Sequence, residues 1–247
     1  MASLYLVGSL AGVAAGDPVT LDGAEGRHAV AVARVRVGET LRLSDGHGTV
    51  VTGTVDTIGR DALTLSVAEV SEEPAPTPTL TLVQALAKGG RDEMAVQAAT
   101  EIGVDRIVPW SAARSVSRWD GAKVEKGRAR WAAIAQEASK QAIRARVPVV
   151  DAPVTTGQLA AGAGEASSRA VLVLDPVGDV RLSSWEPPAD VTEIVLVVGP
   201  EGGIDGSEFD RLVAAGAVRV RLGDTVLRTS TAGPAALAVL QTRLGRW

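Results

Sequence analysis

The chain has 247 residues, of which 46% are hydrophobic and 22% are charged, so we expect a folded globular protein and not a disordered one. It has no cysteine and only two histidines, His28 and His47, which excludes disulfides, thiol catalysis, cysteine-bound zinc and a histidine-rich metal site. No apolar run approaches the ~18 residues of a membrane span, and the start of the chain lacks the basic segment of a signal peptide. We therefore expect a cytoplasmic protein with no metal and no membrane contact.

The net charge of −4 is distributed unevenly along the chain. Residues 1–70 carry a net charge of −3 and residues 149–247 a net charge of −4. Residues 84–148 hold twelve Lys and Arg against seven Asp and Glu, a net charge of +5. Such a basic stretch is typical either of a solvated helix face or of a surface that contacts nucleic-acid phosphates. Charge alone leaves both interpretations open.

The first 70 residues favour an all-β unit. Short apolar or alternating segments are separated by turns, and the pair Asp45-Gly46 is typical of a tight hairpin. The pattern predicts a small β-barrel, a fold that often binds RNA but does not establish that function. Residues 71–79 contain three prolines and predict a linker, so we expect domains at 1–72 and 79–247. The predicted strands are 4–7, 30–37, 41–43, 49–57 and 62–70.

After the linker, apolar runs alternate with helical patterns, which is typical of an α/β domain with a mostly parallel sheet. About six strands are predicted, at 80–86, 106–110, 147–150, 170–174, 194–198 and 218–222. Helices are predicted through Met94 and Ile102, over 123–144, near Gln158 and over 207–215. A final helix is expected to have Pro234 in its first turn and Leu237, Leu240 and Leu244 on one stripe.

The stretch from 193 to 241 carries the most specific pattern. The apolar run 194–198 ends in Gly199-Pro200-Glu201-Gly202-Gly203, a bend at which backbone can approach a ligand closely because glycine has no Cβ. Asp205 and Glu208 then have the spacing of a capping box. With Leu174 and Gly223, these loops lie at the ends of predicted strands, where an α/β sheet binds its ligands.

Familiar catalytic and nucleotide-binding motifs are missing. Both histidines lie in the predicted barrel, which leaves no credible set of nucleophile, histidine and acid, and there is neither a phosphate loop nor a GxGxxG after a strand. What remains is a group of glycine-bearing loops after Leu174, Val198 and Leu222, whose backbone groups suit a small adenosine-like ligand.

Basic side chains gather near the ends of predicted elements, where they fit either phosphate binding or a solvated face. Lys140 and Arg144 are four residues apart and share a helix face. The candidate RNA-binding residues are Arg27, His28, Lys88, Arg91, Arg114, Lys140, Arg144 and Arg146.

Two C-terminal motifs, VVGPEGGIDGSEF at 197–209 and RLGDTVLRTSTA at 221–232, together closely resemble the SPOUT-class RNA methyltransferase family RsmE. That family methylates N3 of a uridine in small-subunit (16S) ribosomal RNA. LVQALAKGGRDEMAVQAATEIGVDRIVPWSAARSV at 82–116 is similar to its strand-helix-strand block, and EASKQAIRARVPVV at 137–150 is similar to the end of its basic helix. The resemblance covers nearly the whole chain.

The resemblance implies a C-terminal SPOUT domain with a deep trefoil knot, preceded by a PUA-like RNA-binding barrel. It implies S-adenosylmethionine as methyl donor, 16S rRNA in the small ribosomal subunit as partner, and a homodimer with the final helix at its interface, so that Leu237 and Leu240 would be interface residues. The donor site implied comprises Leu174, Gly199, Glu201, Gly202, Gly203, Leu222, Gly223, Leu227 and Thr229.

Arg228 and Glu201 are the catalytic candidates. Arg228 would stabilise the uridine anion, or else clamp a phosphate. Glu201 would accept the N3 proton, or else shape the glycine bend. The family usually reads Arg-Thr-Glu-Thr where this chain has Ser230 as the third residue, so a carboxylate that could act as the base is missing. The alternatives are a SPOUT methyltransferase of tRNA ribose and a non-catalytic RNA-binding protein that keeps a donor pocket.

Overall fold

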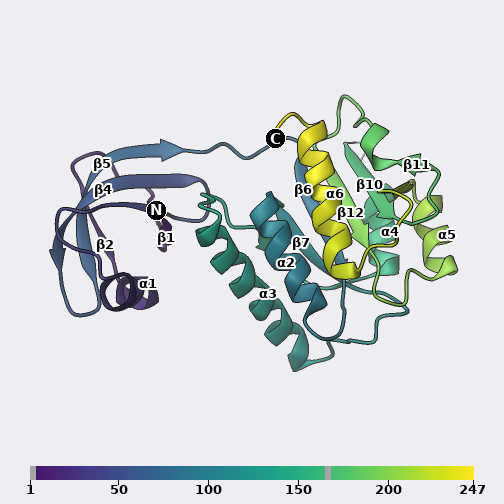
Figure 1. The fold of residues 1–247 in the computed structure, drawn as a ribbon, viewed down its shortest axis with the longest axis horizontal. Coiled ribbons are helices and arrows are strands. Elements are labelled where there is room, and N and C mark those ends of the chain that lie inside the picture. The colour runs from purple at the N-terminus through teal and green to yellow at the C-terminus, as the bar shows by residue number, and fades with distance from the viewer. Residues whose placement is uncertain (1–3, 165–167) are drawn as a thin grey trace. The chain divides into compact units, whose positions relative to one another are not determined.

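The computed structural model describes residues 4–164 and 168–247 and divides the chain into two compact units (Figure 1). The first unit comprises Met1–Ala75 and Ser139–Val147, and the second comprises Pro76–Ala138 and Pro148–Trp247. The sequence did not indicate that 139–147 belongs with the first unit. None of the described helices combines the length and the apolar character needed to cross a membrane.

The first unit is built on a five-stranded sheet in the order β1-β3-β4-β5-β2. Strand β1 pairs in parallel with β3, and the other neighbours are antiparallel. Alternate side chains, among them Leu43, Val51 and Leu65, form its core. The strands are β1 (Leu4–Leu6), β2 (Pro18–Leu21), β3 (Thr40–Ser44), β4 (Thr49–Ile58) and β5 (Leu63–Glu72).

The strand predicted at 30–37 is wrong. Helix α1 (Gly23–Arg27) continues into a π-helical turn at His28–Ala33, and Arg34 then adopts a left-handed conformation with φ 56°. The Ala-Val alternation read as a strand is an apolar run too short to distinguish the two structures. Gly26 sits in this helix against the sheet, where a Cβ would lie 2.6 Å from the carbonyl oxygens of Leu21 and Asp61.

Residues 139–147 are bonded into the first unit at several points. Ser44 Oγ donates to the Ala145 carbonyl at 2.8 Å, and the Val147 N–H donates to the Gly46 carbonyl at 2.9 Å. Lys140 Nζ lies 2.7 Å from a carboxylate oxygen of Glu25. This segment is therefore a structural part of the β-unit.

The second unit is an α/β domain whose eight-stranded sheet has the order β11-β13-β10-β12-β6-β7-β8, with β9 also pairing with β7 (Figure 1). Every strand pair in it is parallel. The strands are β6 (Thr79–Ala85), β7 (Arg106–Ser111), β8 (Val149–Val150), β9 (Val154–Thr155), β10 (Arg169–Leu174), β11 (Val180–Arg181), β12 (Glu193–Val198) and β13 (Val218–Arg221). The helices are α2 (Arg91–Ile102), α3 (Ala122–Gln141), α4 (Thr156–Gly164), a 3-10 turn (Leu182–Ser184), α5 (Gly206–Ala214) and α6 (Thr229–Arg243).

Both faces of this sheet are covered, which explains the unbroken apolar runs in its strands. Along β12, Ile194 and Leu196 join one core together with side chains of α2, α3 and α6, whereas Val195 and Val197 join a second core with α4 and α5. The Figure 1 view shows α2 and α6 side by side on one face. The sheet therefore forms the middle of three layers.

Helix α6 corrects two expectations. It begins at Thr229, so Pro234 is its sixth residue and lies beyond the first turn. Leu237 and Leu240 are fully buried within this one chain, so they are core residues and not interface residues. The helix packs closely on the sheet because Gly233 has no Cβ, which would lie 3.0 Å from Leu82 Cδ1. Strand order does not trace the path of a knot, and the trefoil threading stays a prediction.

Candidate functional site

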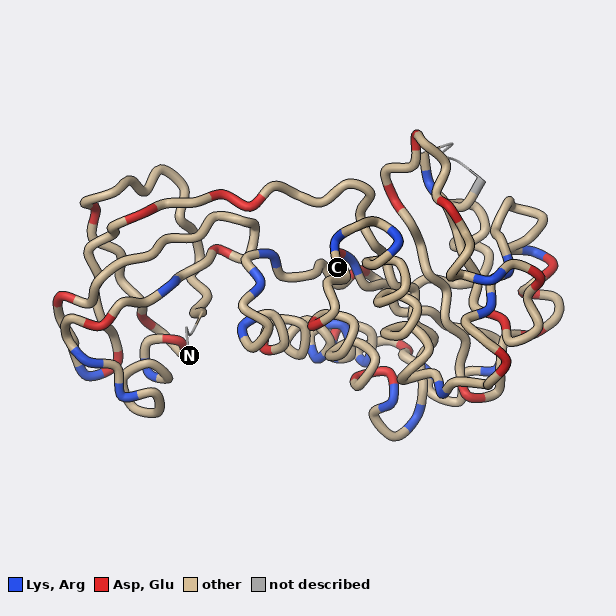
Figure 2. The backbone as a smooth tube through the Cα atoms, turned by 45° about the horizontal axis from the view of Figure 1, so that its top comes forward, with Lys and Arg blue, Asp and Glu red and all other residues tan. Residues whose placement is uncertain are grey.

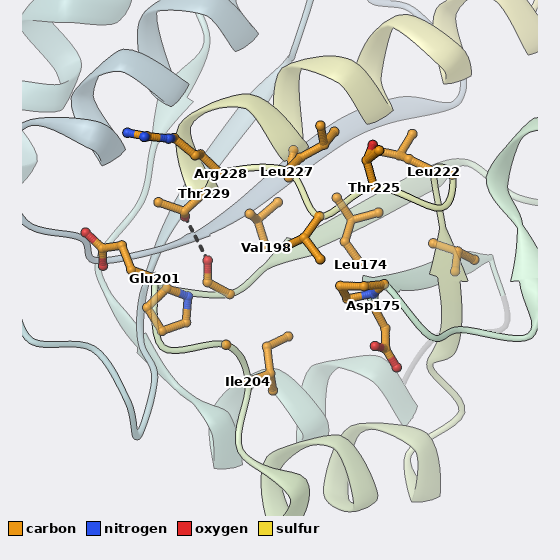
Figure 3. Close-up of a pocket in the computed structure, with 18 of the residues that line it drawn as sticks. Leu174, Asp175, Val198, Glu201, Ile204, Leu222, Thr225, Leu227, Arg228 and Thr229 are labelled. Carbon is orange, nitrogen blue, oxygen red and sulfur yellow. Dashed lines mark hydrogen bonds between the residues drawn. The ribbon is translucent and has the colours of Figure 1, made fainter.

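A cavity of about 530 Å³ lies where β10, β12 and β13 end (Figure 3). Its walls are the loop after β10, the loop from β12 to α5 and the loop from β13 to α6. Because the three strands are parallel, their carboxyl ends meet at one edge of the sheet. The two motifs that dominate the sequence thus face each other across one cavity.

Nearly all of the residues predicted to bind the donor line this cavity. Gly202 does not: it faces Arg114, whose Cβ would lie 3.3 Å from an added Cβ. The predicted donor and catalytic residues that line it are Leu174, Gly199, Glu201, Gly203, Leu222, Gly223, Leu227, Arg228 and Thr229.

The loop from β12 to α5 is fixed at its start by Thr229. Thr229 Oγ1, in the first turn of α6, donates to the Gly199 carbonyl at 2.7 Å (Figure 3). A Cβ on Gly199 would lie 2.6 Å from Ile204 Cγ1, so the loop folds back on itself only with glycine there. Gly203 has φ +72°, a left-handed conformation that also favours glycine.

Glu201 is bonded to the loop that precedes α2. Its Oε1 accepts from the Arg91 guanidinium at 2.9 Å and from the Lys88 N–H at 3.2 Å. Partial burial opposes ionisation, but hydrogen bonds from its own N–H, from Arg91 and from Lys88 hold the pKa of Glu201 below its ordinary value of 4.5. A carboxylate in this state is a weak proton acceptor and a good anchor.

Arg114 and Glu208 hold the far end of the same loop. Arg114 Nη2 lies 3.0 Å from Asp205 Oδ2, and its Nη1 donates to the Gly202 carbonyl at 3.3 Å. Asp205 caps α5 as predicted, and hydrogen bonds from the Ser207 side chain and N–H lower its pKa. The buried Glu208 accepts from the Ala113 N–H at 2.9 Å and from Thr156 Oγ1 at 2.6 Å. The contacts with Asp205 and Gly202 give Arg114 a structural role in holding this loop.

The loop from β13 to α6 ends at Arg228, which lines the cavity and is exposed. Its guanidinium makes no hydrogen bond or ion pair with any residue in the described part of the chain. The same holds for the Lys88 ammonium, at the edge formed by the carboxyl end of β6. Both cations are therefore open to an incoming anionic group.

The predicted RNA-binding residues of the first unit fall into two groups. Arg27 is exposed, and the His28 ring lies near the Tyr5 ring, with centroids 6.3 Å apart. Lys140, with 13% of its side chain exposed, is paired with Glu25, and Arg146 Nε donates to the Glu73 carbonyl at 3.0 Å. Arg144 lies in the same segment as these two. Figure 2 shows basic and acidic residues interspersed along both units.

Sequence reasoning missed several residues of the cavity wall. Asp175 directly follows the predicted strand 170–174, and that position was the available signal. Its Oδ2 accepts from Arg219 Nε at 2.6 Å, and the Arg219 guanidinium carbon lies 4.8 Å from the centre of the Phe209 ring. Nothing in the sequence marked Phe209, which contributes to the site only through tertiary packing. The unpredicted lining residues also include Pro176, Val198, Pro200, Ile204, Val220, Thr225, Val226 and Ala232.

The chemistry of the lining fits an adenosine-type methyl donor. The walls include the aliphatic side chains of Leu174, Ile204 and Leu222, and between them lie backbone groups at glycine-bearing loops and the side chains of Asp175, Thr225 and Thr229. Arg91, a cation at the wall, is neutralised by Glu201, which leaves Arg228 as the one unpaired cation among the described lining residues, whereas a polyphosphate requires a cluster of them. Its volume is that of a typical small-molecule site.

Comparison with known proteins gives a consistent result. Residues 73–241 match the family described as RNA methyltransferase domain, and residues 21–68 match the RNA methyltransferase PUA domain. The chain is 44% identical over 234 residues to ribosomal RNA small subunit methyltransferase E of Mycobacterium bovis, covering 94% of this chain and 89% of that protein. It is 30% identical to the Bacillus subtilis protein of the same name, covering 92% and 91%.

Two solved structures are similar over almost their whole length. One is ribosomal RNA small subunit methyltransferase E from Neisseria gonorrhoeae bound to S-adenosyl methionine, with 27% identity, a TM-score of 0.86 and 98% of each chain covered. The other is a putative methyltransferase from Legionella pneumophila in complex with the same cofactor, with 29% identity, a TM-score of 0.85 and 98% of each chain covered.

Proposed function

Because the chain belongs to the RNA methyltransferase family defined by that domain, we propose that it transfers a methyl group from S-adenosylmethionine to N3 of a uridine in 16S ribosomal RNA. One observation carries the proposal: the two specific motifs form a single cavity of suitable size and lining at the carboxyl edge of the sheet. Relatives that carry the rRNA methyltransferase name and structures bound to the donor support it.

The residues that would hold the donor are those of the three loops. Leu174, Leu222 and Leu227 would contact apolar parts of the ligand, and the backbone at Gly199 and Gly223 would provide its hydrogen bonds. The bound donor supplies an electrophilic methyl group, so the chain's main task is to align the acceptor with it. The fixed loop from β12 to α5 suits that task.

Arg228 is the catalytic residue that we propose. The N3 proton of uridine would pass to solvent water, and the uracil ring would then carry negative charge on its oxygens until N3 takes the methyl group. The Arg228 guanidinium is free, exposed and at the cavity wall, where it can stabilise that charge. If Arg228 stabilises this charge, its removal lowers turnover at saturating RNA. If Arg228 instead contacts an RNA phosphate, its removal lowers the affinity for RNA.

We assign Glu201 to positioning and not to proton transfer. Its lowered pKa makes it a weak base, and its hydrogen bonds to Arg91 and Lys88 tie the fixed loop to the start of α2. In the second unit, Lys88 is the cation we propose for contact with RNA phosphates, and in the first unit Arg27 and His28. Arg114, Lys140 and Arg146 are assigned to structural anchoring, because each has a carboxylate or carbonyl partner.

We also propose that the protein works in the cytoplasm on the small ribosomal subunit, as a homodimer. The resemblance to the family is the support for the dimer, and the burial of Leu237 and Leu240 moves its interface to other residues. Sedimentation equilibrium over a tenfold concentration range tests it: a mass of twice 25.3 kDa is expected, and the mass of a single chain would contradict the dimer.

The test of function is methyl transfer from labelled S-adenosylmethionine to small subunits purified from a strain that lacks this protein, followed by mass spectrometry of the digested nucleosides. We expect 3-methyluridine. A 2′-O-methylated nucleoside from tRNA would instead indicate a ribose methyltransferase. RNA binding with no transfer to any substrate would indicate a non-catalytic protein.

A further inference from the structure

A buried glutamine lies behind the cavity, outside its lining. Gln84 is the sixth residue of β6, is 0% exposed and stands in register with Val198 of β12. Its Nε2 donates to Thr229 Oγ1 at 2.8 Å and to the Ala85 carbonyl at 3.2 Å. Thr229 Oγ1 in turn donates to the Gly199 carbonyl at 2.7 Å. The three residues form a relay from β6 through α6 to the loop after β12.

The direction of this relay restricts which side chain can serve at position 84. A threonine hydroxyl has one proton, and here it is used on the Gly199 carbonyl. The contact between residues 84 and 229 therefore needs a donor on residue 84, which an amide provides and an ionised carboxylate or an apolar side chain does not.

The carbonyl oxygen of the same amide, Gln84 Oε1, indicates that a contribution to stability does not by itself explain why position 84 is a glutamine. Gln84 Oε1 is buried and accepts no hydrogen bond within the described residues. An unpaired buried acceptor destabilises a fold, so a methionine of similar shape would satisfy the packing without that penalty. The hydrogen bond from Nε2 to Thr229 Oγ1 is the reason for an amide at this position.

We propose that Gln84 is a positioning residue for the donor site, an inference that rests on the proposed function. Both groups downstream of it, Thr229 and Gly199, line the cavity, and Thr229 directly follows Arg228. The close approach of Gly233 to Leu82 packs the start of α6 on the sheet. The relay then fixes the rotation of α6 about its own axis and its position along β6. Gln84 thereby joins the two donor loops and directs Arg228 without touching the ligand.

The chain provides a matched control in Gln241. It is also a buried glutamine, 5% exposed, whose Oε1 has no hydrogen-bond partner among the described residues and whose Nε2 donates to the carbonyl of Ile102 at 2.9 Å. It lies on α6 twelve residues after Thr229, about 18 Å along the helix at 1.5 Å per residue. Gln84→Met and Gln241→Met thus remove equivalent amide contacts, one in the relay and one remote from the cavity.

The experiment measures the dissociation constant of S-adenosylhomocysteine by calorimetry, and the thermal midpoint, for the full-length wild type and both variants. Gln84→Met should weaken binding about tenfold, the loss expected for one good hydrogen bond. Gln241→Met should bind within about twofold of wild type, and its thermal midpoint should differ from that of wild type by about as much as the midpoint of Gln84→Met does. Equal affinity in Gln84→Met and wild type, or an equal loss in both variants, overturns the proposal.

Substitutions at Thr229 keep the test decisive if Gln84→Met does not fold. Thr229→Ser retains the hydroxyl and should bind nearly as wild type, whereas Thr229→Val should show the loss. In the double variant, Gln84→Met should add little to Thr229→Val, because both break the same relay; full additivity contradicts it. A wild type that does not bind S-adenosylhomocysteine contradicts the proposed function itself, which separates that failure from failure of the relay.

Discussion

The two loops that carry the specific motifs differ in how they are held. The loop from β12 to α5 is bonded at Gly199, Glu201, Gly202 and Asp205, by partners from three other segments of the second unit. Leu222, at the start of the loop from β13 to α6, packs against the core, but among the described residues 222–227 make one polar contact to another segment, an exposed ion pair between Arg181 and Asp224 with its atoms 4.0 Å apart. One side of the cavity is fixed and the other is open.

The difference separates two tasks. The fixed loop provides a surface whose geometry exists before the ligand arrives, which lowers the entropy lost on binding. The open loop presents Val226, 77% exposed, and leads to Arg228, so it can move aside as the ligand enters and then close on it. We therefore expect substitutions in the fixed loop to change affinity and substitutions at the end of the open loop to change turnover.

The largest effect is expected at the end of the open loop. Arg228→Ala should lower kcat about 100-fold or more, as loss of a group that stabilises developing charge does, while the donor dissociation constant stays within about twofold. Single-turnover methyl transfer at saturating RNA, with calorimetry of donor binding, measures both. Unchanged turnover would remove Arg228 from the mechanism, and weaker donor binding would assign it to the donor.

A pair of glycine substitutions compares the loops directly. Gly199→Ala places a Cβ 2.6 Å from Ile204 Cγ1, so the fixed loop must shift, and donor affinity should fall about tenfold. Gly223→Ala meets no atom within 4 Å and has ordinary backbone angles, so the free protein should keep its thermal midpoint. Equal loss of thermal stability in the two variants would show that the loops are equally constrained.

Glu201→Gln should have a smaller effect. It removes one charge from a partly exposed ion pair with Arg91, so donor affinity should fall about threefold. Because the pKa of Glu201 is lowered from 4.5, its carboxylate is ionised at all higher pH values, and its contribution is lost only as the pH falls through that lowered pKa. The pH–rate profile between pH 6 and 9 should therefore keep its shape; loss of an inflection would restore Glu201 as the base.

The smallest effect is expected at Val226. Val226→Ser changes a side chain that is mostly in solvent, so the thermal midpoint should not move. If the open loop closes on the donor, the variant should release it about twofold faster. Stopped-flow displacement of a fluorescent donor analogue measures that rate, and an unchanged rate would mean that Val226 takes no part in closure.

The sequence predicts the architecture better than the detail of the site. The apolar run 194–198 predicted a strand buried on both faces, and β12 lies there. The spacing of Asp205 and Glu208 predicted a helix start, and α5 begins there. The run 30–37 misled because a short Ala-Val alternation fits a helix as well as a strand.

Partners distant in the chain could not be predicted from it. Lys140 and Arg146 read as a basic helix end, but their roles depend on Glu25 and Glu73, more than 70 residues away. Gln84 was not among the predicted site residues, and its importance appears only when Thr229 is brought beside it. Local pattern specifies elements, whereas a site depends on long-range contacts.

Amide hydrogen exchange on the two loops, with and without S-adenosylhomocysteine, tests this account most directly. The free protein should exchange slowly at 199–205 and quickly at 223–227, and the ligand should slow exchange mainly at 223–227. Equal protection of both loops in the free protein would contradict the contrast between them, and ligand-induced protection away from all three loops that line the cavity would contradict the site itself.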